Sequence, residues 1–409
     1  MKIAMVNHSD INGGAARAAW RIHHALCQSS VNSHMYVNRA LAGDWTVAGP
    51  NSKIEKIFGI LRSPLGGMIT RVLKTGNPIL HSPAILPSSW PKRLNMSDSN
   101  IVHLHWVNGE MMSVADIGRI TKPVVWTLHD MWAFCGAEHY TEDYRWQDGY
   151  KTNSRPKYES GFDLNRWTWQ RKLKAWKKPM HIVTPSRWLA ECARKSVLMR
   201  DWSISVIPNA LDVDSWQPVE KKLARQLMNL PTDCPLLAFG AMGGGQDPRK
   251  GMDLLLAALD HLRGEFQDLQ LLIFGERAPR ELPNLGFPIH YTGHLHDDLS
   301  LRILYSAADA MMIPSRQDNL PNTGVEALAC GTPVIAFDTC GLPDIVTHQE
   351  TGWLAKAFDT EDLARGIQWV LGDAARHIML SRQARRYAVD KFATSVVVPQ
   401  YQKIYQKLF

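Results

Sequence analysis

Short apolar runs separated by helical patterns recur along the whole chain, and this alternation constrains the fold more than any other feature. The runs are apolar on both faces, as is typical of strands buried in a parallel sheet with helical connections. Five lie in the front half, at 2–7, 34–38, 101–106, 123–128 and 181–186, and four in the back half, at 236–241, 269–275, 310–315 and 333–337. The pattern predicts an α/β chain with two Rossmann-like domains, parallel sheets and a ligand site in the cleft between them.

The boundary between the two domains is expected near residues 206–218, where Pro208, Asn209 and Pro218 interrupt the periodicity. A chain of 409 residues is also too long for one ordinary core. We therefore predict an N-terminal domain over 1–205, a C-terminal domain over 206–388, and a final helical segment, 389–409, that can return to the first domain.

Charge is divided unevenly between the two halves. Residues 1–200 carry 27 Lys and Arg against 14 Asp and Glu, whereas residues 201–409 carry 19 against 25. A basic front half suits nucleic acid, anionic lipid headgroups or a phosphorylated acceptor. Because no recognised nucleic-acid-binding motif is present, we expect no nucleic-acid partner.

The start of the chain and its cysteines bear on location. The sequence turns polar at Asn7 and His8, too soon for a signal-peptide core, and the six cysteines are dispersed without a C-x-x-C pair. Reduced thiols and the lack of a leader predict a cytoplasmic chain that can associate with the inner face of the plasma membrane.

Two motifs follow predicted strands in the front half. Gly13-Gly14 opens an Ala-rich helix carrying Arg17 and Arg21, an arrangement that suits an anion, although a glycine pair before a helix is also an ordinary turn. His129-Asp130 follows the run 123–128, where the imidazole can bind a sugar hydroxyl or move a proton and the carboxylate can fix its tautomer or cap a helix. An ordinary loop histidine is the alternative, and it applies equally to His103 and His105.

The back half has a glycine-rich loop with two cations and a pair of carboxylates. After the run 236–241, "MGGGQDPRKG" places Arg249, Lys250 and Gly251 at a helix start, which suits a diphosphate or is simply a solvated basic turn. In "PSRQDNLPNTGVEALACGTPVIAF", Asp318 falls in the loop after a strand and Glu326 in the second turn of a helix that starts at Pro321–Asn322 and stops at Gly331. A turn residue and a helix-dipole charge would explain each carboxylate separately. One pocket explains both together with the cations.

In combination these residues resemble the retaining family 4 glycosyltransferases, which have the GT-B fold of two facing Rossmann-like domains. Asp318 and Glu326 match the E-x7-E pattern of that family, and the likeness extends to Gly13-Gly14, "TLHDMW", "IPNALD", Arg249-Lys250-Gly251 and "GLPDIV…TGWLA". The resemblance covers nearly the whole chain. It implies a hexosyltransferase of the type that acts in bacterial surface polysaccharide biosynthesis, such as that of exopolysaccharide or O-antigen.

The resemblance also implies a role for each site residue. Glu326 would hold the ribose hydroxyls of the donor nucleotide, and Arg249 and Lys250 would neutralise its diphosphate. Asp318 would contact hydroxyls of the donor sugar, and because it is one methylene shorter than the family's Glu, it bears on sugar preference. The remaining donor-binding groups would be the backbone N–H groups of Leu320, Asn322 and Thr323, the loop of Gly13 and Gly14, and the side chain of His129.

A metal-independent mechanism is expected, because the paired cations can supply the charge that a metal would. The resemblance implies front-face attack with the departing phosphate oxygen as base, so that Asp318 and Glu326 position the donor. No cofactor is expected beyond a UDP- or GDP-sugar donor, and the acceptor is a saccharide, free or linked to a polyprenyl diphosphate. The alternatives are a nucleotide-sugar epimerase, a phosphorylase, which would need a pyridoxal lysine, and a non-catalytic two-domain sugar-binding protein.

Three segments of the front half are left over. In 166–178, Trp169, Leu173 and Trp176 share one helical face among six Lys and Arg, a pattern of helices that lie in a membrane interface or of ordinary packed helices. The segment 53–74 is a second membrane candidate, which we expect to break at Pro64 and at Gly66-Gly67. The aromatic, polar insert 135–163 suits a lid or an acceptor loop.

Overall fold

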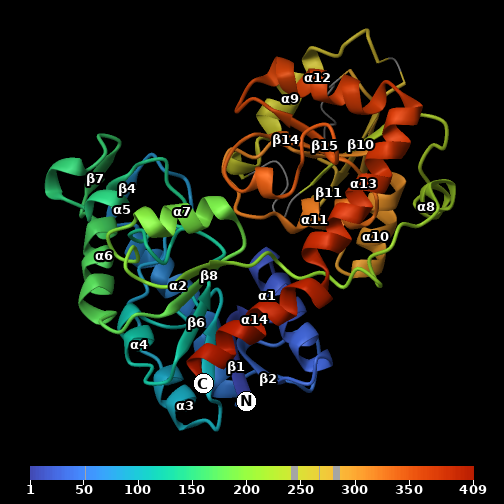
Figure 1. Ribbon diagram of the computed structural model, residues 1–409. Helices are drawn as coiled ribbons and strands as arrows, with labels where there is room; N and C mark the ends of the chain where they lie inside the picture. Colours follow the sequence, from blue (N-terminus) through green and yellow to red (C-terminus); the bar gives the residue numbers. More distant parts are fainter. Residues whose placement is uncertain (51, 241–246, 267, 280–285) are drawn as a thin grey trace. The chain divides into compact units, whose positions relative to one another are not determined.

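The computed structural model describes all residues of the 409-residue chain except 51, 241–246, 267 and 280–285. The described chain divides into two compact units, which are treated separately below. Unit 1 contains Met1–Asn209 together with Val398–Phe409, and unit 2 contains Ala210–Val397. Figure 1 shows both units with their helices and strands labelled.

Unit 1 is built on a parallel sheet of seven strands in the order β3-β2-β1-β5-β6-β8-β9. Its central strands are almost fully buried, as the apolar runs predict. The strands are β1 (Lys2–Ser9), β2 (Asn32–Arg39), β3 (Val47–Ala48), β5 (Ile101–Leu104), β6 (Val124–Thr127), β8 (His181–Thr184) and β9 (Ile204–Val206). Because all of them run in parallel, their carboxyl ends meet at one edge of the sheet.

Unit 1 also contains helices and a small sheet of two strands that are far apart in the sequence. The helices are α1 (Gly14–Gln28), α2 (Lys53–Thr70), α3 (Trp90–Met96), α4 (Val114–Gly118), α5 (Arg145–Asp148), α6 (Leu164–Ala175), α7 (Arg187–Lys195) and the 3-10 turn η1 (Thr152–Ser154). The strands β4 (Leu73–Thr75) and β7 (Glu159–Gly161) pair antiparallel. Apolar side chains of α3, α4, α6 and α7 pack against β5, β6 and β8 in one core.

Unit 2 is a second parallel sheet, with six strands in the order β12-β11-β10-β13-β14-β15. Its strands are β10 (Leu236–Gly240), β11 (Gln270–Phe274), β12 (Ile289–Gly293), β13 (Ala310–Ile313), β14 (Val334–Phe337) and β15 (Gly352–Ala355). Helices cover both faces: α9 (Met252–Asp260) and α12 (Thr360–Leu371) on one, and α8 (Lys221–Leu227), α10 (Asp298–Ala307), α11 (Asn322–Ala329) and α13 (Ala374–Phe392) on the other. The 3-10 turns η3 (Pro248–Lys250) and η4 (Leu342–Asp344) complete it. All nine predicted strands are confirmed, and both units are Rossmann-like.

The last helix, α14 (Thr394–Leu408), carries the chain back into unit 1. Its Tyr401 and Tyr405 are fully buried there. The Tyr405 hydroxyl lies 2.7 Å from Nδ1 of His103, and the Tyr401 hydroxyl lies 3.2 Å from Oγ1 of Thr127. Two buried phenol groups with hydrogen-bond partners therefore fix the end of the chain to β5 and β6.

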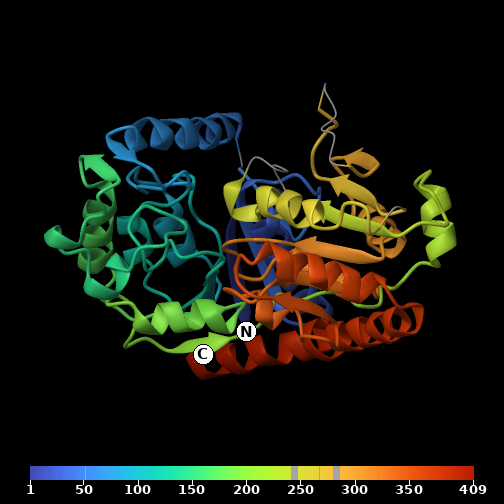
Figure 2. The ribbon, with the colours of Figure 1, turned by 90° about the horizontal axis from the view of Figure 1, so that it is seen from above.

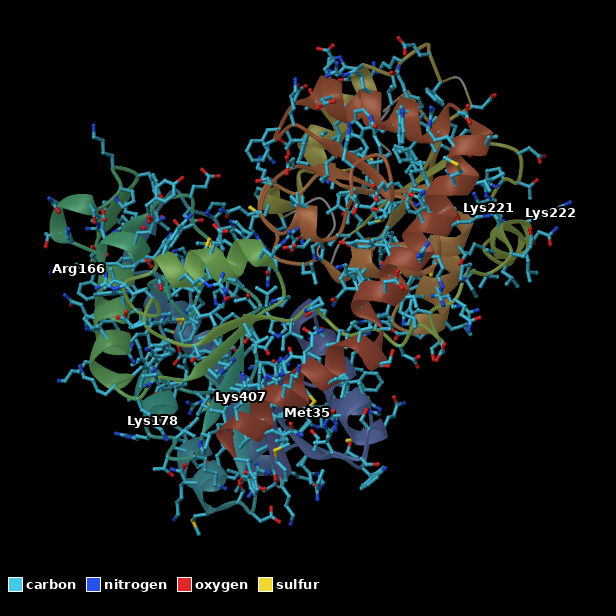
Figure 3. All side chains as sticks on the ribbon, viewed as in Figure 1. Met35, Arg166, Lys178, Lys221, Lys222 and Lys407 are labelled. Carbon is cyan, nitrogen blue, oxygen red and sulfur yellow. The ribbon has the colours of Figure 1, made fainter. Side chains whose placement is uncertain are left out.

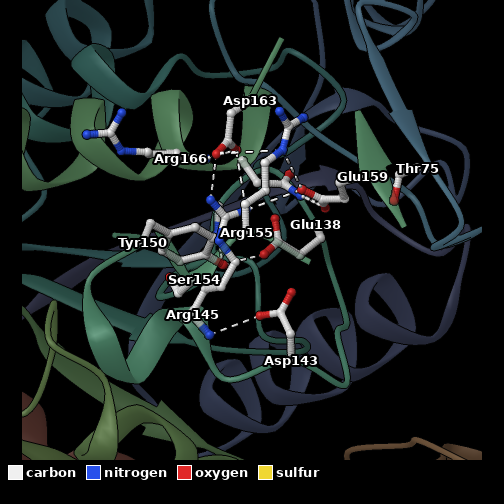
Figure 4. Close-up of polar contacts among 12 residues, drawn as sticks. Thr75, Glu138, Asp143, Arg145, Tyr150, Ser154, Arg155, Glu159, Asp163 and Arg166 are labelled. Atoms are coloured by element: carbon white, nitrogen blue, oxygen red, sulfur yellow. Dashed lines mark hydrogen bonds and ion pairs between the residues drawn. The ribbon is translucent and has the colours of Figure 1, made fainter. Parts of the chain in front are cut away.

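Buried polar contacts join residues of the insert 135–163 to one another (Figure 4). The guanidinium group of Arg145 donates to Asp163 at 2.6 Å and to Glu159 at 3.2 Å, and the Tyr150 hydroxyl donates to Glu138. Arg145 and Tyr150 are almost completely buried. A paired and hydrogen-bonded charge of this kind is costly to break. Trp146 and Tyr150 also belong to the unit 1 core, so the insert is a packed part of the unit. The lid and acceptor-loop interpretations both stay predictions.

Helix α6 corrects the prediction that 166–178 lies in a membrane interface. Trp169 and Trp176 are each only 5% exposed and belong to the unit 1 core. Lys172, one turn from both, is also buried, and its ammonium group donates to backbone carbonyls of Trp132, Cys135 and Gly136. Leu173 is 43% exposed, but both tryptophans of the predicted face pack inward, as the alternative interpretation held, together with the ammonium group of Lys172.

The predicted break of the segment 53–74 is also wrong. Helix α2 runs through Pro64 and both glycines, and helix α14 likewise contains Pro399. In α2 the side chains of Arg62 and Ser63 donate to loop carbonyls beside Pro64, which holds the helix in place across the missing N–H group. Among the residues that the structure describes, no helix has both the length and the apolar character to cross a bilayer.

Candidate active site

An ion pair marks the carboxyl end of β13 in unit 2. The Lys250 ammonium nitrogen lies 2.6 Å from Oδ2 of Asp318, and the two side chains are 21% and 10% exposed. Asp318 also accepts the backbone N–H of Asn319 at 3.0 Å. The structure therefore brings together one predicted cation and the first predicted carboxylate, in a partly buried setting where charge interactions are strong.

The turn of residues 248–251 explains how Lys250 reaches Asp318. Its side chain leaves η3, whose N-terminal cap is Asp247, and Gly251 follows with φ of +69°. A Cβ atom on Gly251 would lie 1.9 Å from the carbonyl oxygen of Pro314, just after β13. Glycine is thus needed twice, for its left-handed backbone and for this close approach. It packs the basic turn directly against the loop that carries Asp318.

Substituting Gly251→Ala is expected to lower the free energy of unfolding by about 2 to 4 kcal/mol, because strain in the left-handed region adds to the clash with Pro314. Urea unfolding of the intact chain measures the change in the free energy of unfolding. Gly293→Ala is the matched control, since Gly293 has φ of +70° but nothing within 4 Å of the added Cβ. Equal losses in the two variants would contradict the role of the close approach.

Arg249 lies on the same turn but faces a different carboxylate. Its guanidinium group forms two hydrogen bonds to Asp247, at 3.2 and 2.6 Å. The two predicted cations therefore lie on the same turn, but Arg249 pairs with Asp247 and Lys250 pairs with Asp318. The glycine-rich loop predicted beside them, 241–246, lies outside the described residues.

Glu326 lies in the second turn of α11, as predicted, and is only 2% exposed. The hydroxyl of Tyr305, a buried residue of α10, donates to Oε2 of Glu326 at 2.9 Å. Sequence reasoning missed Tyr305, because a tyrosine inside an apolar helix has the pattern of a core residue. Its hydrogen bond fixes the orientation of the Glu326 carboxylate.

The start of α11 places three more predicted residues. Asn322 and Thr323 are its first two residues and are partly exposed, and Leu320 is buried just before them. The amino end of a helix carries a partial positive charge that attracts anions. Gly331 ends the helix with φ of +73°, so both predicted ends of this helix are confirmed.

In unit 1, the Gly13-Gly14 loop lies at the carboxyl end of β1. Gly13 has φ of +105° and precedes α1, whose first residue is Gly14. Asp10, which sequence reasoning missed, fixes this loop because its carboxylate accepts the backbone N–H groups of Ile11, Leu41 and Ala42 at 2.7–2.9 Å. A buried carboxylate inside a polar run has no periodic signal, so only the fold reveals it.

His129 follows β6 at the same edge of the unit 1 sheet. Its Nε2 atom lies 3.0 Å from Nδ1 of His105, and the two rings stack. Burial lowers the pKa of His129 to about 4, so the imidazole is neutral at pH 7. Asp130 turns away from it: its carboxylate accepts the N–H of Trp132 and lies 2.6 Å from Nδ1 of His139. His105, rather than Asp130, therefore orients His129.

A cavity in unit 1 lies away from these residues. It has a volume of about 250 Å³ and is lined by Val124 and His181, the first residues of β6 and β8, together with Lys178 and Lys407. Figure 3 labels both lysines on the surface of the unit. The cavity is thus at the amino ends of the strands, the opposite edge from His129, and is separate from the candidate site.

The chemistry of the unit 2 edge suits an anionic ligand with hydroxyl groups. Lys250 supplies positive charge, the start of α11 supplies a positive helix end, and Glu326 can accept hydrogen bonds from hydroxyls. In the part of the chain that the structure describes, no three His, Cys, Asp or Glu side chains form a group that could hold a metal ion.

Family comparisons match both units. Residues 12–215 match the model of the glycosyltransferase family 4 and residues 236–373 match that of the glycosyl transferases group 1. The chain carries the two domains of a GT-B glycosyltransferase. Solved structures with the GT-B fold align with the whole chain, which confirms the predicted fold.

Two solved structures illustrate the likeness in fold. Sucrose-phosphate synthase from Thermosynechococcus elongatus has a TM-score of 0.67 and 19% identity, with 100% of this chain and 99% of the other covered. The Anabaena protein HepE, solved in complex with UDP and glucose, has a TM-score of 0.65 and 14% identity over the full length of both chains.

Curated relatives are more similar in sequence but over shorter stretches. A D-inositol 3-phosphate glycosyltransferase of Xylanimonas cellulosilytica is 29% identical over 214 residues, which is 47% of this chain and 50% of the relative. That of Geodermatophilus obscurus is 32% identical over 199 residues, 45% of this chain and 43% of the relative. The chain thus matches about half the length of these relatives.

Proposed function

We propose that this GT-B chain transfers a sugar from a nucleotide sugar to a saccharide acceptor. The observation that carries the proposal is the partly buried pair of Lys250 and Asp318, set at a strand end beside the helix that holds Glu326. Solved structures of the same fold were obtained with UDP-glucose or with UDP and glucose bound, which supports a nucleotide-sugar donor. A UDP- or GDP-sugar is the proposed donor, with no further cofactor.

Each site residue has a proposed task. Lys250 and Arg249 neutralise the diphosphate, whose negative charge grows as it departs. The amino end of α11, at Leu320, Asn322 and Thr323, binds the same group. Glu326, held by Tyr305, accepts hydrogen bonds from the ribose. Gly13 and Gly14 let their loop approach the phosphate, and the neutral imidazole of His129 and the carboxylate of Asp318 contact the donor sugar.

The proposed reaction retains the anomeric configuration and needs no metal ion. The departing phosphate oxygen takes the proton of the acceptor hydroxyl on the same face of the sugar, so that Asp318 and Glu326 only position the donor. Asp318 is unsuited to nucleophilic attack while it is paired with Lys250 at 2.6 Å. Recovery of a sugar covalently attached to either carboxylate would refute this mechanism.

For the acceptor we propose a lipid-linked saccharide, such as a polyprenyl diphosphate-linked sugar of surface polysaccharide assembly. The excess of Lys and Arg in residues 1–200 supports an anionic acceptor and contact with an anionic membrane on the cytoplasmic side. A second candidate is an inositol phosphate, because the curated relatives are named for that acceptor. It too is anionic, and it would need no membrane.

The decisive test is nucleotide release from a panel of UDP-, GDP- and ADP-sugars in the presence of EDTA. It is run without acceptor, with a lipid diphosphate-linked sugar and with inositol 3-phosphate, using Glu326→Ala and Lys250→Ala as controls. The proposal expects release from one donor, stimulated by one acceptor and lost in both variants. Binding of no nucleotide sugar at all would favour the non-catalytic alternative, and conversion of the donor sugar without acceptor would favour an epimerase.

His105→Phe is expected to lower kcat/KM about tenfold, while the affinity for the free nucleotide, bound by unit 2, stays the same. Phenylalanine keeps the stacked ring but removes the nitrogen that lies 3.0 Å from His129. Steady-state kinetics and calorimetric binding of UDP measure the two quantities. Partial recovery in His105→Gln, which restores a hydrogen-bonding group, separates positioning from packing. An unchanged kcat/KM in His105→Phe would contradict the role of His105.

A further inference from the structure

Helix α2 presents a row of apolar residues to solvent, while Arg62, Ser63 and Gly66 contact the protein. Six apolar residues at intervals of three or four are between 48% and 67% exposed: Ile54, Ile57, Leu61, Leu65, Met68 and, just after the helix, Val72. This spacing keeps them on one narrow side of the helix. We call these six residues the α2 stripe. Figure 2 shows α2, in blue, along the outer edge of unit 1.

Polar contacts on the opposite side fix this orientation. The guanidinium group of Arg62 donates to the backbone carbonyls of Glu110, Leu86 and Pro87 at 2.5–3.0 Å, and the Ser63 hydroxyl donates to that of Gly109 at 2.9 Å. Gly66 lies so close to Glu110 that an added Cβ would come within 2.6 Å of its side chain. The helix is therefore held with the α2 stripe outward. Such an inverted face on a surface helix indicates an interaction surface.

Cations lie at both ends of the α2 stripe. Lys53 and Lys56 are exposed near its start, and Arg71 and Lys74 near its end, while Glu55 is the one acid of the helix. A further exposed apolar residue lies beside its far end: Phe162, which is 50% exposed, donates its backbone N–H to the carbonyl of Val72 at 3.1 Å. Apolar residues flanked by basic ones are typical of helices that lie in an anionic membrane interface.

Charge decides between a membrane and a second copy of the chain. If two α2 helices paired in parallel, Lys53 and Lys56 would meet their own counterparts, and if they paired antiparallel, they would meet Arg71 and Lys74. Both arrangements place like charges together, which opposes association. An anionic bilayer surface, by contrast, complements the cations at both ends while its acyl region takes up the stripe.

We propose that the α2 stripe is a membrane-docking surface that inserts into the interface of a bilayer containing anionic phospholipid. This deepens the proposed function, because it names the surface through which the chain would reach a lipid-linked acceptor, and it replaces α6 by α2 in that role. The inference concerns binding alone. Its test therefore uses vesicles and no activity measurement, so that it can fail while the transferase proposal stands, and the reverse.

The test is vesicle flotation of the intact chain with phosphatidylcholine alone and with phosphatidylcholine plus phosphatidylglycerol. The variant Leu61→Gln/Leu65→Gln/Met68→Gln is expected to lose at least about tenfold in partitioning onto anionic vesicles. Its matched control is Leu223→Gln/Leu227→Gln/Leu299→Gln, which removes three exposed leucines from unit 2 and is expected to bind like the unchanged chain. A second variant, Lys53→Glu/Lys56→Glu, is expected to lose the preference for anionic lipid.

Three results would overturn the inference. The unchanged chain could fail to bind either vesicle, or the α2 triple variant could bind as the unchanged chain does. The unchanged chain could also sediment as a dimer that the triple variant converts to a monomer, in which case a second copy covers the stripe. Because all substituted side chains are exposed, thermal unfolding followed by circular dichroism is expected to be the same in all variants, which separates docking from folding.

Discussion

Lys250→Ala is expected to lower kcat/KM for nucleotide-sugar turnover by about 10² to 10³-fold, the usual loss when a group that stabilises developing negative charge is removed. Two consequences add up. The proposed diphosphate loses one of its two proposed cations, and Asp318 loses the ammonium group 2.6 Å away that holds its carboxylate in place. The loss should appear mainly in kcat, because charge on the diphosphate grows toward the transition state. Steady-state kinetics with the donor that the nucleotide-sugar panel selects measures it.

Lys222→Ala is the matched control for that variant, since Lys222 is an exposed lysine of α8 in the same unit, labelled in Figure 3. It is expected to leave kcat/KM unchanged. Lys250→Arg keeps the charge but carries a planar fork instead of a compact ammonium group, so we expect partial activity. A Lys250→Ala enzyme within twofold of the unchanged chain would contradict the assignment of the diphosphate to this turn.

Unit 1 is expected to lose several kcal/mol of stability as the pH falls from 7 to 5. Burial lowers the pKa of His8, His23 and His129 to about 4 and that of His103 to about 3. Below pH 6.5 the unfolded chain binds protons at these residues that the folded chain does not. Their contribution is therefore complete above pH 6.5 and is lost as the pH falls toward 4, by about 1.4 kcal/mol per pH unit for each histidine.

Two buried carboxyl groups, Glu138 and Glu159, act in the opposite direction, because burial raises the pKa of each. Burial raises the pKa of Glu138 to about 7, so as the pH falls the folded chain binds a proton there before the unfolded chain does. This gain in stability offsets about as much free energy as one of the four histidines loses. The net sign remains destabilising. Urea unfolding at pH 7 and pH 5, followed by tryptophan fluorescence, measures the change, and His103→Phe is expected to show a shallower pH dependence. Equal or greater stability at pH 5 would contradict the burial of these imidazoles in neutral form.

Local sequence patterns predicted the interior of both sheets but not their edges. The nine predicted strands include every strand with two neighbours, whereas β3, β9, β12 and β15 were missed, and all four are edge strands. An edge strand is covered less completely, and these four are only partly buried, so they lack the apolar run that marks a central strand. The fold class therefore follows from the central strands alone.

Candidate site residues were predictable where a local motif carries them. Gly251, Gly331 and the start of α11 each depend on backbone geometry within a few residues, which the sequence encodes directly. Tyr305 behind Glu326, and His105 behind His129, act across long separations, so only the assembled sheets reveal them. Helix periodicity likewise predicted an apolar face in both α6 and α2, but not that α6 turns it inward and α2 outward.

The configuration of the newly formed glycosidic bond, determined by NMR spectroscopy, tests the central claim most directly. The donor is the α-linked nucleotide sugar that the panel identifies, incubated with its acceptor in EDTA. Sugar transfer with retention predicts a product with an α linkage. A product with a β linkage would contradict retention, and an acceptor left unmodified while the donor sugar is released or isomerised would contradict the assignment of the chain as a glycosyltransferase.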